Sequence, residues 1–424
     1  MRYLQFLLAT AVKSLRNRFF TTSLTVLSIA LSVALLIGIE RIRSGARDSF
    51  SNTISQTDLI VGARGGTIQL LLYSVFRIGS ATNNIGVDSW EHFRNHPSTA
   101  WTIPYSLGDS HRGYRVVGTN NDFYEHYRFH GDRRMEVAKG ELPKERFDVI
   151  LGSEVAEAIG YRVGDRIVVS HGISDVSIVA HDNMPFTVRG ILARTATPID
   201  RSLYISLEAM EAIHMDWTDG APPVRGTETK PETIRVEDIK PQQITAFLLR
   251  TKSRIDTLHL QREINTFADE PLLAIIPGVA LSELWNGLSY AEDALRIVSL
   301  FVIVVGLLGM LVSLYNSLNE RRREMAIFRA VGAGPGTILV LLVVESFVLT
   351  LAGIVLGVTM TYGSLITMQP IIEGWFGMHI PISMLSGMEW LWLALVLGSG
   401  ILLGAVPAAR AYRNTLIDGL TIRV

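Results

Sequence analysis

Residues 19–39 read FFTTSLTVLSIALSVALLIGI and include no charged side chain. A helix needs roughly 20 apolar residues to cross a hydrocarbon core about 30 Å thick, so this run is long enough for a membrane span. Three more predominantly apolar stretches lie in the last third of the chain, and we predict spans at 294–319, 338–363 and 390–409. We therefore predict an α-helical membrane protein with four transmembrane helices, in which a large domain, residues 41–293, is inserted between helix 1 (19–40) and helix 2.

Basic residues next to the spans predict the orientation, because short cytoplasmic segments carry an excess of Lys and Arg. They gather before the first span, between spans two and three, and after the fourth, whereas the connection 364–389 has none. These residues are Lys13, Arg16, Arg18, Arg321, Arg322, Arg323, Arg329, Arg410 and Arg413. We expect both termini, including residues 410–424, and the loop 320–337 to be cytoplasmic, and 41–293 and 364–389 to lie across the membrane. No small-residue cleavage site follows the first run, so we expect it to be retained as an anchor.

Residues 1–18 place apolar side chains at helical spacing and most polar ones on another face. This pattern is typical of a cytoplasmic amphipathic helix lying at the membrane interface. The alternative is a simple extension of the first span.

The inserted segment alternates short β-like runs with helical stretches and with turns rich in Gly, Asn, Asp and Pro, which predicts an α+β domain. The predicted strands are Tyr114–Val117, Asp148–Leu151, Arg166–Ser170, Phe186–Leu192 and Ile244–Leu249, and the predicted helices are Glu154–Ile159, Leu207–His214 and Arg254–Phe267. We expect Gly45–Ser55 and Leu281–Ala291 to continue their spans as helical stalks. The Pro-rich stretch Trp217–Lys240 is predicted to be a loop or an insertion.

The motifs of nucleotide hydrolysis and of common catalytic sites are missing from the sequence. A phosphate-binding loop needs a Gly-rich turn followed by Lys and Ser or Thr, and residues 332–337, GAGPGT, have the glycines without the lysine. Neither a Gly-x-Ser-x-Gly elbow nor a His-Glu-x-x-His helix is present, and there is no cysteine. We therefore expect no catalytic residue and no enzyme activity in the chain itself. A net charge of −1 argues against a nucleic-acid partner.

Nine of the ten histidines lie in the inserted segment. His171, His181 and Asp182 flank a short stretch between two predicted strands, and they are our candidate metal ligands. His126 and His130 have the i, i+4 spacing that would put both rings on one helix face. The alternative is that these are ordinary histidines of a domain that makes up most of the soluble part of the chain.

Glu345 lies about two turns inside the third predicted span. A lone carboxylate at such a depth costs roughly 3 kcal/mol unless it is paired or hydrated. We expect either a functional role for it or a pairing near the cytoplasmic interface.

Between the second and third spans the chain reads NERRREMAIFRAVGA, residues 319–333. Met325, Phe328 and Val331 recur at helical spacing after a charged start, and Gly332 ends the pattern. We predict a short cytoplasmic helix that can dock in a groove of a soluble partner. A positively charged stop-transfer loop is the alternative.

This stretch, together with the sequences 344–346 and 353–357 of the next span, resembles the FtsX-like permease signature of the MacB/LolC/LolE group of ABC transporters. The C-terminal segment 406–413 is similar to the last span of that group, and segments 148–156 and 186–192 are similar to its periplasmic core domain. The resemblance covers nearly the whole chain.

The resemblance implies a permease subunit of the bacterial inner membrane whose inserted domain is periplasmic. It also implies a homodimeric or heterodimeric permease, with a second copy of this chain in a homodimer expected, and a separate cytoplasmic ATPase. ATP and Mg²⁺ would then bind the ATPase, and this chain would hold no cofactor. Hydrolysis would be relayed to the periplasmic domains, a mechanism called mechanotransmission. The coupling helix that meets the ATPase would contain Arg322, Arg323, Glu324, Ile327, Phe328 and Arg329.

The resemblance does not select the cargo. A periplasmic adaptor or substrate-binding protein is a further candidate partner, and membrane lipid surrounds the spans. Two alternatives from other classes remain: a component of a zinc-handling ABC system that uses the exposed histidines, and an ATP-independent membrane scaffold or receptor.

Overall fold

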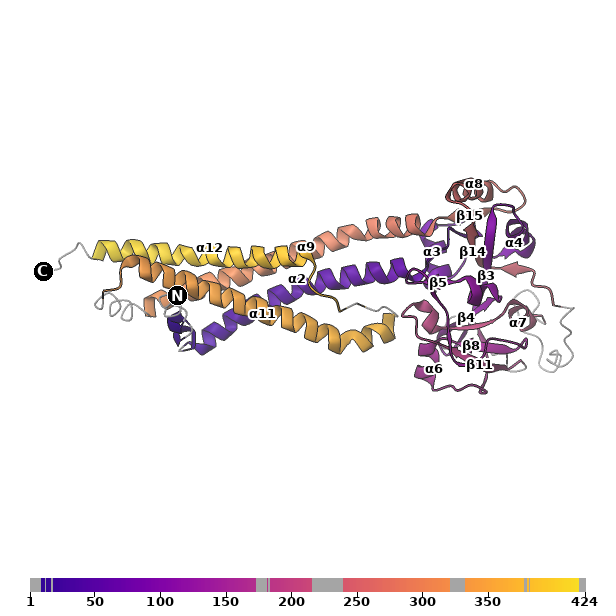
Figure 1. Cartoon of the computed structure of the whole chain (residues 1–424), viewed down its shortest axis with the longest axis horizontal. Helices are drawn as coiled ribbons and strands as arrows, with labels where there is room; N and C mark the ends of the chain where they lie inside the picture. The colour runs from indigo at the N-terminus through magenta and orange to yellow at the C-terminus, as the bar shows by residue number, and fades with distance from the viewer. Residues whose placement is uncertain are drawn as a thin grey trace. The chain divides into compact units, whose positions relative to one another are not determined.

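The structure is a computed structural model, and it describes residues 9–11, 13–16, 18–172, 181, 184–215, 239–320, 332–376, 380 and 382–418. The chain divides into two compact units. The first, which we call the helical unit, comprises residues 1–45, 289–369 and 380–424, and the second, the α+β unit, comprises 46–288 and 370–379. The long helices and the sheet are drawn in Figure 1.

Among the described residues, four helices are long and apolar enough to cross a membrane, and the four predicted spans lie within them. The helices run beyond the predicted spans, because each continues past the end of its apolar run. They are α2 (Phe19–Thr53), α9 (Pro277–Glu320), α11 (Pro335–Phe376) and α12 (Gly387–Asp418). All four contribute to one buried cluster, with Val33, Met310, Leu349 and Leu393 as examples. Many of the outward-facing side chains are apolar as well, as expected for helices in lipid.

Glycines allow close approach of the helix backbones in the helical unit. Gly353 and Gly357 of α11 face α2, where a Cβ added to Gly357 would lie 2.6 Å from the carbonyl oxygen of Ala30. Gly400 and Gly404 of α12 likewise meet side chains of α11. The hydrophobic effect does not drive helices together in lipid, so their association depends on close van der Waals packing. Small residues spaced four apart permit this packing.

The α+β unit is built on a large mixed sheet. Its described strands follow the order β15-β1-β14-β3-β4-β12-β8-β11-β7, with β10 paired to β3 and β9 paired to β11, while β13 with β2 and β5 with β6 form two separate two-stranded sheets. The strands are β1 (Leu59–Ala63), β2 (Ile85–Gly86), β3 (Thr99–His111), β4 (Tyr114–Thr119), β5 (Arg128–Phe129), β6 (Arg133–Arg134), β7 (Val137–Gly140), β8 (Asp148–Leu151), β9 (Arg166–Ile167), β10 (Ser170–His171), β11 (Phe186–Leu192), β12 (Ser202–Ser206), β13 (Gln243–Ile244), β14 (Ala246–Thr251) and β15 (Leu272–Ile275). The short helices are α3 (Thr67–Val75), α4 (Val87–Arg94), α5 (Asp122–His126), α6 (Ser153–Ile159), the 3-10 turn η1 (Pro198–Arg201), α7 (Leu207–Ala212) and α8 (Arg254–Asn265).

These elements confirm the α+β class predicted from the sequence. Strands β8 and β11 have the predicted bounds, while the predicted strand Arg166–Ser170 divides into β9 and the start of β10. Fully buried aromatic rings such as Tyr105, Phe123 and Tyr204 fill the core beneath the sheet. Of the predicted Pro-rich loop Trp217–Lys240, all but the last two residues lie outside the described residues.

Helices α2 and α9 both extend into the α+β unit, at residues of the predicted stalks. The end of α2 is tied to this unit, since the Tyr127 hydroxyl donates to the carbonyl oxygen of Thr53 at 2.8 Å. Next to it, the N–H of Ser55 donates to the carbonyl of Arg128 at 2.9 Å. On α9, Ala280 is fully buried in the core of the unit.

Replacing Gly357 by Leu should destabilise the helical unit, because the new side chain would collide with the backbone of α2 at Ala30. Overpacking a tight contact costs about 1–3 kcal/mol, and thermal unfolding of the purified protein in detergent would measure the loss. Gly363 of the same helix is exposed and has open space where a Cβ would lie, so Gly363→Leu is the matched control. Equal melting temperatures for the two variants would contradict the packing argument.

Candidate metal centre and buried polar groups

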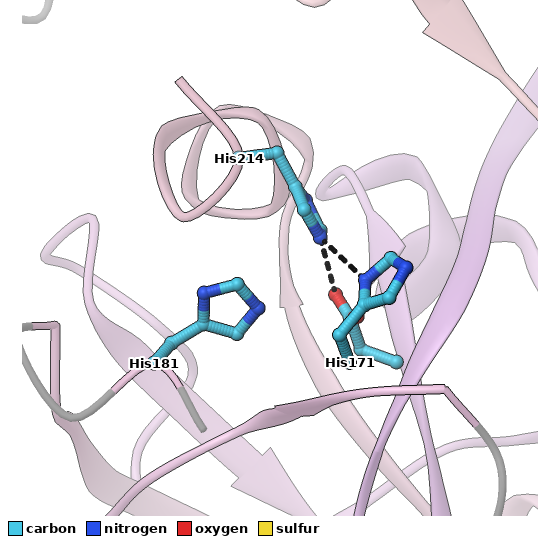
Figure 2. A group of neighbouring side chains, drawn as sticks. His171, His181 and His214 are labelled. Carbon is cyan, nitrogen blue, oxygen red and sulfur yellow. Dashed lines mark hydrogen bonds and ion pairs between the residues drawn. The ribbon is translucent and has the colours of Figure 1, made fainter. Parts of the chain in front are cut away.

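Four side chains with metal-ligating atoms converge in the α+β unit: Asp109, His171, His181 and His214 (Figure 2). One ligand atom from each lies within 4.8 Å of the others. They come from four separate stretches of the chain, so the fold assembles the group.

Strand pairing brings the first two together. Strands β3 and β10 are antiparallel, and their register sets His171 directly opposite Asp109. The register between β3 and β4 shifts between Leu107 and Ser110, which marks a bulge at Gly108 and Asp109. Bulges redirect side chains, and the Asp109 side chain here is fully buried. The strand pair therefore presents a buried carboxylate beside a ring that is 46 % exposed.

The other two histidines reach the group from different sides. The backbone N–H of His181 donates to the carbonyl of Val169 at 2.9 Å, which holds His181 beside β10. His214 follows α7, and its ring Nδ1 lies 2.9 Å from the carbonyl oxygen of Met210 one turn earlier. A carbonyl only accepts, so this Nδ1 carries the proton and Nε2 points toward Asp109.

The ligand atoms lie close to one another. Nδ1 of His171 is 3.1 Å from Oδ1 of Asp109 and 3.1 Å from Nε2 of His214. Nε2 of His214 is 3.5 Å from Oδ2 of Asp109. His181 packs with its ring centroid 5.0 Å from that of His214.

Charge couples these groups. Burial alone would raise the pKa of Asp109, but hydrogen bonds from His171 and His214 outweigh it and hold that pKa at about 2. The pKa of His214 is raised, since the hydrogen bond and charge of Asp109 outweigh the effect of burial, which by itself would lower it. The carboxylate is thus ionised at neutral pH and supplies the negative charge of the group.

The sequence named two of these four residues. His171 and His181 lie together, whereas Asp182, the third residue named, lies outside the described residues. Asp109 and His214 were missed because they are 62 and 43 residues from His171. A single sequence has no local spacing that reveals a contact of this range. The one signal was that His214 is the last residue of a predicted helix.

The predicted pairing of His126 with His130 on one helix face is wrong. Helix α5 ends at His126, the next residue is extended, and His130 has a φ of 46°. The two rings have separate partners: His126 stacks on Trp101, and Nε2 of His130 lies 3.1 Å from the carbonyl oxygen of Thr195. The chain leaves the helix at Tyr127 and enters β5 at Arg128, before it reaches His130.

A second group of ligand-type residues within the described chain consists of Asp122, Glu125 and His126 on α5. It has one imidazole, no buried member, and an aspartate within 3.9 Å of the Arg94 guanidinium. Exposed acidic groups of this kind are common on helices, so it is the weaker candidate.

Glu345, the polar residue predicted inside the third span, is buried on α11. Its Oε1 accepts a hydrogen bond from the Ser14 hydroxyl at 3.3 Å. A carboxylate held this way in the helical unit ties the segment before the first span to α11.

A second buried pair in the helical unit was missed by sequence analysis. Arg41 of α2 and Glu389 of α12 are both buried, with Nε and Oε1 2.6 Å apart. The guanidinium also donates to the Ser383 hydroxyl, the Tyr362 hydroxyl and the carbonyl of Met384. Hydropathy missed the pair because both residues lie just outside the apolar runs. A usable signal was the Ser386-x-x-Glu389 capping box that starts α12.

The predicted coupling residues Arg322, Arg323, Glu324, Ile327, Phe328 and Arg329 all lie outside the described residues. Their assignment stays a prediction.

Four long apolar helices with a large α+β domain between the first and the second define a multi-pass membrane protein with an extramembrane domain. Its sequence matches the MacB-like periplasmic core domain over residues 22–266 and the FtsX-like permease C-terminal domain over residues 296–416. The chain belongs to the MacB-like, FtsX-type permease family of ABC transporters.

Relatives with assigned names are similar over part of their length. The macrolide export ATP-binding/permease protein MacB of Marinobacter nauticus is 25 % identical over 95 % of this chain and 58 % of its own length. The MacB protein of Escherichia coli strain K12 is 32 % identical over 42 % of this chain and 27 % of its own length. The chain therefore spans little more than half the length of the Marinobacter nauticus protein.

Two solved structures are also similar. The periplasmic region of MacB from Actinobacillus actinomycetemcomitans is 10 % identical, covering 55 % of this chain and 95 % of that one, with a TM-score of 0.35. The extracellular domain of the noncanonic ABC-type transporter YknZ from Gram-positive bacteria is 11 % identical, covering 51 % and 98 %, with a TM-score of 0.29. These scores are too low for a detailed comparison.

Replacing Arg41 by Gln should lower the stability of the helical unit by about 3–5 kcal/mol, because Glu389 would remain buried without its counter-charge. Thermal unfolding in detergent would measure the loss, and the double variant Arg41→Gln with Glu389→Gln should recover part of it. Arg296 is 45 % exposed in its ion pairs, so Arg296→Gln is the control, with an expected change of about 0–1 kcal/mol. If Arg41→Gln melted like the control, the buried pair would not be structurally important.

Proposed function

We propose that this chain is the permease subunit of an ATP-driven ABC transporter that moves or extrudes a periplasmic or membrane substrate. The observation that carries the proposal is the order of its parts: a MacB-like periplasmic core domain followed by an FtsX-like permease domain, on a chain with four long apolar helices. In this arrangement the α+β unit is periplasmic and both termini are cytoplasmic.

A separate ATPase supplies the energy in this proposal. Residues 1–424 contain no phosphate-binding loop, and the relatives that the chain resembles are named ATP-binding/permease proteins. The bound ATP and Mg²⁺ then belong to the partner, which meets the permease at the segment containing Phe328 and Arg329.

The proposed mechanism is mechanotransmission. Helix α2 is continuous from Phe19 to Thr53 and α9 from Pro277 to Glu320, so each carries an apolar span and ends or begins in the α+β unit. A continuous helix moves as a rigid element between two packings. The hydrogen bond between Tyr127 and Thr53 supports transfer of that movement to the domain. A second copy of the chain completes the transporter as a homodimer, and a periplasmic adaptor or substrate-binding protein is the remaining candidate partner.

One observation favours a second candidate function. The group of three histidines and one buried aspartate in the α+β unit suits a metal-handling system. In that case the metal, or a carrier of it, would be what the transporter acts on. The scaffold alternative has no such observation in its favour.

The first test is affinity purification of the tagged chain in mild detergent, with mass spectrometry and an ATPase assay on the eluate. An ABC-type ATPase should co-purify with the unaltered chain. A variant carrying Phe328→Ala and Arg329→Glu should lose it, because the apolar contact and the charge of the proposed coupling helix are both changed.

Arg410→Glu is the control for this test, since it reverses a basic charge at another predicted cytoplasmic position. It should retain the ATPase. An unaltered chain that elutes alone and without ATPase activity would argue for the scaffold reading instead.

Continuity of α2 and α9 can be tested separately, and the lack of cysteine makes labelling specific. A spin label on Ile255→Cys, an exposed position on α8, would report the distance between the two copies by double electron–electron resonance. Nucleotide bound to the ATPase should change that distance. Inserting four glycines after Gly45 and after Leu288 should abolish the change, because flexible segments do not transmit helix movement.

Insertion of four alanines at the same two places keeps the helices and is the matched control. It should preserve the nucleotide-dependent change. A change that persists with the glycine insertions would show that helix continuity is not needed.

A further inference from the structure

We propose that Asp109, His171, His181 and His214 form a binding site for one divalent transition-metal ion of the Zn²⁺ class. The inference concerns the α+β unit alone and does not depend on the proposed transport function. It adds Asp109 and His214 to the two histidines expected from the sequence.

The spacing of the ligand atoms fits a tetrahedral ion. Zn²⁺ lies about 2.0–2.1 Å from imidazole nitrogens, so two ligands of a tetrahedral site are about 3.3 Å apart. Three of the separations are 3.1, 3.1 and 3.5 Å, between His171 Nδ1 and Asp109 Oδ1, His171 Nδ1 and His214 Nε2, and His214 Nε2 and Asp109 Oδ2. One ligand atom of each of the four residues lies within 4.8 Å of the others, so His181 is placed to supply the fourth ligand (Figure 2).

The surroundings of His214 orient it as a metal ligand. Its Nδ1 proton is taken by the carbonyl of Met210, and metal-bound histidines usually donate the other ring proton in this way. Nε2 therefore faces the carboxylate of Asp109 and Nδ1 of His171. In the metal-free protein a proton on Nε2 makes the contact with Asp109, and a metal ion that replaces this proton binds Nε2, the carboxylate and Nδ1 of His171 at once.

The ligand types select the metal. Three imidazoles suit Zn²⁺ and its neighbours in the first transition row, whereas Mg²⁺ and Ca²⁺ prefer oxygen ligands. Four protein ligands fill a tetrahedral shell and leave no open position for an activated water. The site is therefore one for binding rather than for hydrolysis.

The proposed metal site is buried on one side and exposed to solvent on the other. Asp109 and His181 are buried, while the side chains of His171 and His214 are 46 % and 28 % exposed. A metal ion can enter from the side of His171 and is then held by the buried carboxylate. Because the ligands come from β3, β10, the residue at 181 and the end of α7, a bound ion would cross-link four parts of the α+β unit. Metal binding should accordingly stabilise the folded chain.

The test uses the full chain in detergent, purified through a tag without histidine and stripped with EDTA. It is incubated with Zn²⁺ alone or Mg²⁺ alone, passed through gel filtration, and analysed for bound metal by plasma mass spectrometry. We expect one equivalent of Zn²⁺ and none of Mg²⁺. Replacing Zn²⁺ by Co²⁺ should give the intense visible absorption of a tetrahedral complex.

Variants locate the site. His171→Ala and His214→Ala should each weaken Zn²⁺ binding by about tenfold or more, since loss of a ligand exceeds the loss of a supporting contact. His259→Ala, at an exposed position on α8, should bind like the unaltered chain, and circular dichroism without metal would verify that each variant is folded.

Either of two binding results would overturn the proposal. One is no Zn²⁺ on the unaltered chain. The other is full binding by both His171→Ala and His214→Ala, which would assign the metal to another group such as that on α5. The Co²⁺ spectrum needs no variant. A weak octahedral spectrum would also reject the tetrahedral site.

Discussion

The arrangement of the helical unit depends on one buried ion pair, between Arg41 of α2 and Glu389 of α12. Arg41 and Glu389 are both almost fully buried, and neither could be tolerated there alone. Their pairing, completed by Tyr362, Ser383 and the carbonyl of Met384, links α2, α11 and α12 at one level. Glu389 also caps the first turn of α12. The Glu389 carboxylate therefore caps the first turn of α12 and also binds Arg41 of α2. This contact holds α2 beside the start of α12.

Close packing at glycines of α11 also holds α2 in position. The close approach at Gly353 and Gly357 requires a particular rotation and height of α11 against α2, and the ion pair and hydrogen bonds of Arg41 join α2 to α11 and α12 in this same arrangement. Directional polar contacts thus specify the arrangement, and dispersion between small residues stabilises it. In the mechanism proposed above, a small movement of these helices would change several of the contacts together.

The features that sequence predicted are those set by local pattern. Four spans followed from run length and hydropathy, and strands such as Asp148–Leu151 followed from apolar residues between turn residues. Features set by distant contacts were missed: Asp109 meets His171 through strand pairing across 62 residues, and Arg41 meets Glu389 across 348. The His126–His130 prediction failed because helical spacing was assumed where the helix had already ended at His126. The roles of the predicted coupling residues rest on sequence similarity.

Strands β1 and β15 are antiparallel neighbours, with Ile60 opposite Ile275 and Ala63 opposite Leu272. The chain thus enters and leaves the α+β unit through adjacent strands, as is common where one domain has been inserted into another. Such a domain can be exchanged as a cassette, since its two ends already meet. Evolution could then alter what is recognised outside the membrane without redesigning the helices that cross it.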